Sequence, residues 1–133
     1  PAEQGEAPAR AIEPAGSAAI RAPMIVITGL HDGSAAGAVV RELQRFDIVI
    51  FVSRNAAEFG TALIREENES LDGLPVFAVG LGTAASLRAQ GVKQVVTPAS
   101  EFSSEGLLRL DGLSEHKIRD KRIVIFRGVG GRE

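Results

Sequence analysis

The residues of this chain that could act on a ligand gather in short turns after four apolar runs, and most are glycines, hydroxyl residues and arginines. None of these runs ends in a catalytic acid, histidine or cysteine. Main-chain amides at helix starts, hydroxyls and guanidinium groups suit a ligand with several negative charges. The turns therefore predict an anion-binding site with few groups for acid–base chemistry. The candidate binding residues are Ser53, Arg54, Asn55, Gly82, Thr83, Ala84, Ser103, Ser104, Glu105, Gly106, Arg127 and Gly128.

These turns need a scaffold that brings them to one edge, and the apolar runs supply it. The runs are continuous and rich in β-branched residues, without polar alternation, which is typical of parallel strands buried on both faces. Helical segments separate them, so we predict an α/β fold with a doubly wound parallel sheet in flavodoxin-like order. The predicted strands are residues 47–52, 75–79, 92–96 and 122–126.

The helices are predicted from apolar spacing and from capping residues. In the helix predicted over 55–66, we expect Ala56, Phe59, Leu63 and Ile64 to form the apolar face. Gly91 stands where a helix over 83–90 should end. The other predicted helices are 34–46, capped by Ser34, and a short helix from Ser103 or Ser104 to Leu110, followed by a charged turn.

The first 24 residues are organised differently from the rest. Pro8 and Pro14 interrupt a helix-like stretch, so we expect a weak or kinked helix there. Residues 18–28 look extended, with Pro23 and Met24 as a candidate boundary between two pieces. The chain ends just after a strand and a glycine turn, which normally feed a helix, so we expect a truncated domain.

Composition narrows the possible functions. With 133 residues and 44% hydrophobic residues, the chain can bury one domain-sized core. A net charge of −2 does not indicate nucleic-acid binding, and the absence of cysteine excludes disulfides and thiol catalysis. The two histidines, His31 and His116, lie in polar sequence and are expected to be solvated, so no metal site is predicted. No membrane-spanning run or signal peptide is visible, and a cytoplasmic location is expected.

Two glycine-rich turns have alternative interpretations. Residues 80–85 match G-x-G-x-x-A, a variant of the dinucleotide-binding fingerprint, but the tip of the next strand carries Thr97 and Pro98 where a ribose-binding acid belongs. A plain tight turn is the simpler interpretation, and the amides of Gly82, Thr83 and Ala84 could still hold an anion. Residues 127–132 lack the Lys-Ser/Thr ending of a P-loop.

The serine turns are equally ambiguous. Ser53 could serve only as a helix cap, or its hydroxyl and the first helical amides could also face a ligand crevice. The two roles are compatible. The same alternatives hold for the turn at 103–106.

Several short motifs together resemble uroporphyrinogen-III synthases. Residues 46–56 (FDIVIFVSRNA) are similar to the family segment YDWVIFTSxNAV, and residues 78–84 (AVGLGTA) to AVGxxTAxAL. Residues 104–108 (SEGLL) and 121–132 (KRIVIFRGVGGR) resemble SEGLL and KRVLxxRGxGGR. Residues 1–16 resemble the family's first helix, although this chain has prolines where the family has Leu or Ala.

The resemblance implies two flavodoxin-like lobes joined by a two-stranded linker, with the substrate between them. Residues 1–24 would then be a remnant of the first lobe, and residues 25–133 an incomplete second lobe. The implied enzyme is a hydro-lyase that cyclises hydroxymethylbilane, which carries eight carboxylates, to uroporphyrinogen III in haem biosynthesis. It needs no cofactor, is a monomer, and makes at most transient contact with hydroxymethylbilane synthase. This fragment alone is expected to be inactive.

A second interpretation is a non-catalytic flavodoxin-like module that binds a nucleotide or a protein. A receiver-type domain is disfavoured because no strand tip carries the required aspartate.

Overall fold

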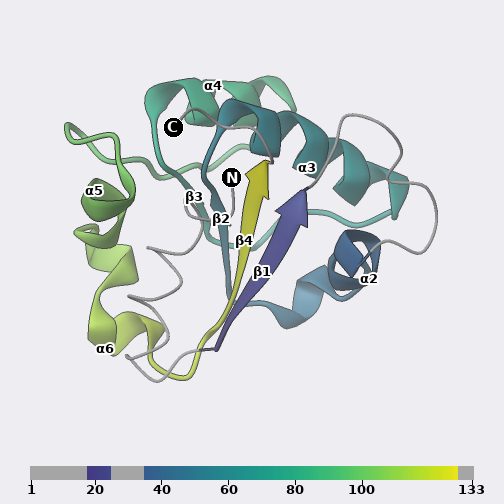
Figure 1. Ribbon diagram of the computed structural model, residues 1–133, viewed down its shortest axis with the longest axis horizontal. Helices are drawn as coiled ribbons and strands as arrows, with labels where there is room; N and C mark the ends of the chain where they lie inside the picture. The colour runs from purple at the N-terminus through teal and green to yellow at the C-terminus, as the bar shows by residue number, and fades with distance from the viewer. Residues whose placement is uncertain (1–17, 25–34, 129–133) are drawn as a thin grey trace.

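The computed structural model describes residues 18–24 and 35–128, and a parallel β-sheet forms its centre (Figure 1). The four strands lie in the order β1-β4-β2-β3, and every pairing between them is parallel. The predicted parallel α/β sheet is therefore confirmed. The strands are β1 (Ala18–Met24), β2 (Ile48–Phe51), β3 (Val76–Ala78) and β4 (Arg122–Gly128).

The sheet is extended beyond β3 by a single parallel bridge between Phe77 and Val96. Val96 donates to the Val76 carbonyl and accepts from the Ala78 amide, both at 2.9 Å. The predicted strand at 92–96 therefore has the expected place and direction, but its length is wrong. Val96 lies at the sheet edge and is half exposed, so little burial supports a longer strand.

With this bridge counted as the fourth strand in chain order, the strand order along the sheet is 1-5-2-3-4. A flavodoxin-like sheet has the order 2-1-3-4-5. If each strand number of the flavodoxin-like order is lowered by one, and strand 1 is renumbered as strand 5, the order becomes 1-5-2-3-4. The sheet is therefore a circular permutation of the flavodoxin-like arrangement, in which β4 takes the place of the first strand.

Helices cover both faces of the sheet, as Figure 1 shows with α5 and α6 on one side and α2 and α3 on the other. Two separate apolar clusters fill the spaces between the layers, one built on Val49, Phe51, Val124 and Phe126, the other on the alternate residues of β2 and β4. On the first face lie α2 (Ala35–Arg41), the 3-10 turn Leu43–Arg45, α3 (Arg54–Glu66) and α4 (Leu81–Ala89). On the second lie α5 (Ser104–Leu108), the 3-10 turn Asp111–Leu113 and α6 (Glu115–Ile118).

Most predicted helices are present, with shifted ends. The helix predicted over 34–46 breaks after Arg41 into a 3-10 turn, and its expected cap, Ser34, lies outside the described residues. The helix predicted over 83–90 begins earlier, at Leu81, and Gly91 follows it with a φ of +94°, which favours glycine. The charged turn predicted before β4 contains the short helix α6, because Ile118 is buried there.

β1 pairs with β4 along its whole length, from Ala18 opposite Arg122 to Met24 opposite Gly128. Pro23 is tolerated in β1 because this strand has no described neighbour on its other side. Residues 18–24 thus share a sheet with the rest of the described chain, while the division into two lobes at residue 24 stays a prediction. The helix expected over 1–16 lies outside the described residues.

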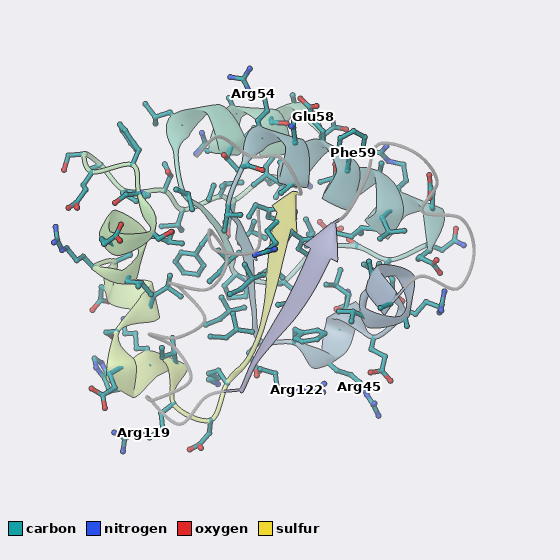
Figure 2. The ribbon with its side chains drawn as sticks, in the orientation of Figure 1. Arg45, Arg54, Glu58, Phe59, Arg119 and Arg122 are labelled. Atoms are coloured by element: carbon teal, nitrogen blue, oxygen red, sulfur yellow. The ribbon has the colours of Figure 1, made fainter. Side chains whose placement is uncertain are left out.

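The apolar face of α3 is rotated relative to the prediction. Phe59, expected in the core, is 44% exposed and lies on the outer side of the helix (Figure 2). Gly60 is buried in its place, because the stacked rings of Phe51 and Phe126 leave no room for a side chain there. A Cβ on Gly60 would lie 2.9 Å from an atom of each ring.

We expect Gly60→Ala to destabilise the protein, although alanine is the better helix former. The intrinsic helical gain is about 1 kcal/mol, whereas overpacking a core typically costs about 1–3 kcal/mol. Gly60→Val should cost more than Gly60→Ala, while Glu58→Ala, exposed in the same helix, should change stability by less than about 0.5 kcal/mol. Chemical denaturation measures all three, and a stabilised Gly60→Ala variant would contradict the packing described.

Candidate functional site

The turns that were predicted to bind a ligand follow the strands, and they lie at one edge of the sheet because all strands run in the same direction. The Val52 amide donates to the Phe126 carbonyl at 3.1 Å, and the Val79 amide donates to the Phe51 carbonyl at 3.1 Å. These two hydrogen bonds fix the turn after β2 beside the end of β4, and the turn after β3 beside the end of β2. The Ser53 turn is therefore central at this edge.

The boundary between the neighbouring strands β2 and β4 lies at the centre of the candidate site. In the permuted order, β4 and β2 take the places of the first and third flavodoxin-like strands, whose carboxyl ends flank the topological switch point. In open parallel sheets, ligands bind in the crevice that opens at such a point. Ser53 follows β2 by two residues, and Arg127, which is only 8% exposed and has a contact of its own, lies near the end of the neighbouring strand β4. Gly128 follows at the end of β4.

Two of the predicted serines cap helices. The Ser53 hydroxyl accepts from the Ala56 amide at 3.0 Å at the start of α3. The Ser103 hydroxyl accepts from the Gly106 amide at 3.1 Å at the start of α5. The capping role is thus confirmed for both serines. The Gly106 amide is occupied by this cap, while contact of Gly106 with a ligand stays a prediction. Gly106 is needed for another reason, since a Cβ there would lie 1.8 Å from the Glu101 carbonyl oxygen.

The glycine turn after β3 differs from the prediction in two residues. The Ala84 amide donates to the Gly80 carbonyl at 2.9 Å, so this amide cannot hold an anion as expected. Thr83 is only 7% exposed, so its hydroxyl is less accessible than predicted. The first-turn amides of Leu81, Gly82 and Thr83 have no partner within α4 and remain candidates.

Arg54 joins the turn after β2 to the turn after β3. A Cβ placed on Gly82 would lie 3.0 Å from the Arg54 Nη2 atom and 3.7 Å from its Nε atom. The guanidinium group therefore lies across the Gly82 backbone, at the start of α4, while remaining exposed (Figure 2). Within the described part of the chain, Arg54 makes no ion pair. Asn55 is exposed next to it.

The turn before α5 approaches the same region through Phe102. A Cβ on Gly80 would lie 3.5 Å from the Phe102 Cβ. Ser104 is half-buried and Glu105 is exposed in the first turn of α5. Phe102 and Leu81 are 48% and 59% exposed, and neither was a predicted site residue. The sequence signal that could have indicated Phe102 and Leu81 was a large apolar residue directly beside a predicted turn.

Acid–base groups are sparse near these turns. The pKa of Asp111 is lowered because Lys117 donates a hydrogen bond to its carboxylate and adds an attractive charge, but Asp111 lies between α5 and α6. His116 is exposed in α6, and His31 lies outside the described residues. Over residues 18–24 and 35–128, no cluster of His, Cys, Asp or Glu could hold a metal ion. In the same ranges, no helix is long and apolar enough to cross a membrane.

A cavity of about 630 Å³ lies at the opposite, amino-terminal end of the strands. It is lined by the end of α3, the loop before β3 and the segment that follows α4. Arg65, Glu69, Asp72 and Lys93 give this cavity a mixed charge. It contains none of the predicted site residues, and such mixed charge does not favour a polyanion.

The comparison with known proteins identifies the family. A family model described as uroporphyrinogen-III synthase HemD matches residues 6–133. The chain belongs to the uroporphyrinogen-III synthase family. Three curated uroporphyrinogen-III synthases are similar to it: those of Proteus mirabilis (28% identical over 134 residues), Escherichia coli K12 (33% over 88) and Salmonella typhimurium (29% over 134).

The match covers all of this chain in the Proteus and Salmonella proteins and 65% of it in the Escherichia protein. The aligned part spans 66%, 54% and 35% of the lengths of the Proteus, Salmonella and Escherichia proteins. The chain therefore corresponds to about a third to two thirds of these relatives. The predicted family resemblance is confirmed.

We expect Gly82→Asp to abolish anion binding at this turn without unfolding the protein. The new carboxylate would pair with Arg54, and an acid in the first turn of a helix is favourable. Gly82→Asn fills similar space without the charge and serves as the matched control. In the full-length protein, we expect a polycarboxylate to bind at least about tenfold more weakly to the Asp variant than to the Asn variant. Equal affinities would remove Arg54 and this turn from the site.

Proposed function

We propose that the protein containing this chain is a uroporphyrinogen-III synthase, which cyclises hydroxymethylbilane to uroporphyrinogen III with loss of water and inversion of ring D. The observation that carries this proposal is the family match over residues 6–133. The arrangement of Arg54 and the helix starts at the strand ends supports it, since the substrate carries eight carboxylates.

The reaction makes modest demands on protein side chains. Loss of the hydroxyl group as water gives an azafulvene, which closes at the substituted carbon of ring D to a spiro intermediate. The protein has to hold the bilane so that this closure outcompetes the uncatalysed one. Helix-start amides, hydroxyls and the exposed Arg54 at the strand ends would serve that task by binding carboxylates at several points.

Several finer features belong to the same proposal. The enzyme is a hydro-lyase without a cofactor, a cytoplasmic monomer that meets hydroxymethylbilane synthase only transiently. Residues 1–24 belong to a first lobe and residues 25–133 to a second, with the substrate between the lobes. The substrate contacts the predicted binding residues at the strand ends, the first of which is Ser53 and the last Gly128. The family match does not favour the alternative, a non-catalytic module.

The proposal is tested by coupling the full-length protein to a deaminase that supplies hydroxymethylbilane and by separating the product isomers. We expect the type III isomer from the full-length protein. The 133-residue chain alone should leave only the type I isomer, because the aligned part spans only 35–66% of the relatives' length and the proposed cleft needs both lobes. Type I product from the full-length protein would contradict the proposed function, and type III product from the short chain would contradict the two-lobe cleft.

We expect single hydroxyl deletions to have modest effects on this reaction. Ser53→Ala, Thr83→Ala and Ser104→Ala each remove one contact and leave the neighbouring amides, so kcat/KM should fall on the order of tenfold. Ser53→Ala should also cost about 1 kcal/mol of stability, because Ser53 caps α3. Steady-state kinetics on full-length variants measures the fall in kcat/KM. A folded but inactive variant would show that one residue is a catalyst and that binding is not distributed.

A further inference from the structure

Phe102 is an exposed aromatic ring on a firmly held segment. Its neighbours fix its backbone on both sides: the Ser103 amide donates to the Glu101 carbonyl at 2.9 Å, and the Ser103 hydroxyl caps α5. Glu101 is also paired with Arg109, and its carbonyl lies against Gly106. The ring is therefore presented at a defined place even though 48% of the residue is exposed.

That place is the carboxyl end of β3. The Phe102 Cβ stands against Gly80, the N-cap residue of α4. Val52 and Val79, the residues that follow β2 and β3, are half-buried and pack on the same side of the sheet as α5. An apolar strip therefore runs along the strand ends, with Phe102 at its border.

Polar and cationic groups lie next to this strip. Ser53 follows Val52 directly, and Arg54 lies across Gly82, two residues beyond Gly80. A flat apolar ring that carries carboxylate arms could contact an aromatic face and a guanidinium group at the same edge of the sheet.

We infer that Phe102 is a substrate-contacting residue that holds one pyrrole ring of the linear tetrapyrrole, while Arg54 and the helix starts hold its carboxylates. This inference rests on the proposed function and adds to it a residue and a contact type. Phe102 makes no covalent contribution; it orients one ring so that the carboxylates and the reacting end are positioned together.

The test uses the full-length protein with Phe102→Ala, Phe102→Leu and Phe102→Trp. We expect KM for hydroxymethylbilane to rise about tenfold in the Ala variant, with kcat changed by less than about threefold, because ring contact is a binding term. The Leu variant should fall between Ala and wild type, and Trp should restore KM to within about threefold. Phe59→Ala, which removes a similarly exposed ring from the outer side of α3, should leave both constants unchanged.

Thermal unfolding separates the inference from a structural role. Wild-type melting temperatures in the Phe102 variants, together with the raised KM, support it. An unchanged KM in Phe102→Ala overturns the inference. If the melting temperature also falls, the ring has a structural role, and if it does not fall, the ring has no role in binding or stability. Failure of the wild-type protein to make the type III isomer would instead reject the proposed function.

Discussion

The stacked rings of Phe51 and Phe126 hold together the part of the molecule on which the rest depends. Their centroids are 4.7 Å apart and their planes differ by 11°, and both residues are fully buried. They are partners in register on β2 and β4, close to the turn that carries Ser53 and next to Arg127 in β4. The pair thus sets how the two central strand ends, and every turn beside them, are placed.

This constraint explains how residues far apart in the sequence come together at one edge of the described sheet. Parallel strands buried on both faces must end together, and each following helix must begin there. Helix starts and small residues accumulate at that edge because the connections are tight. Arg54 adds the cation, and its reach across Gly82 is possible because glycine has no side chain.

Much of the fold follows from the sequence, because its signals are strong and local. Continuous apolar runs predicted β2, β3 and β4, and serines with helical spacing behind them predicted α3 and α5. The sequence did not predict the rotation of α3, since the exclusion of Phe59 comes from the Phe51–Phe126 pair on two other strands. The same limit applies to residues 92–96, where edge position rather than composition decides the strand length.

The candidate site was predictable in position but not in detail. Which amides are already occupied, such as those of Ala84 and Gly106, depends on local helix geometry that residue types do not specify. The contact of Arg54 with Gly82 and that of Phe102 with Gly80 join segments far apart in the sequence. Neither contact could be derived from spacing along the chain.

We expect the ligand to bind at the carboxyl ends of β2, β3 and β4, and not in the cavity at their amino ends. Amide NMR of the isotope-labelled full-length protein, titrated with uroporphyrin III as a stable polycarboxylate, tests this directly. The largest shift changes should occur at residues 53–55, 80–83 and 102–104. Changes concentrated at residues 69–73 and 90–94, which line the cavity, would contradict binding at the carboxyl ends.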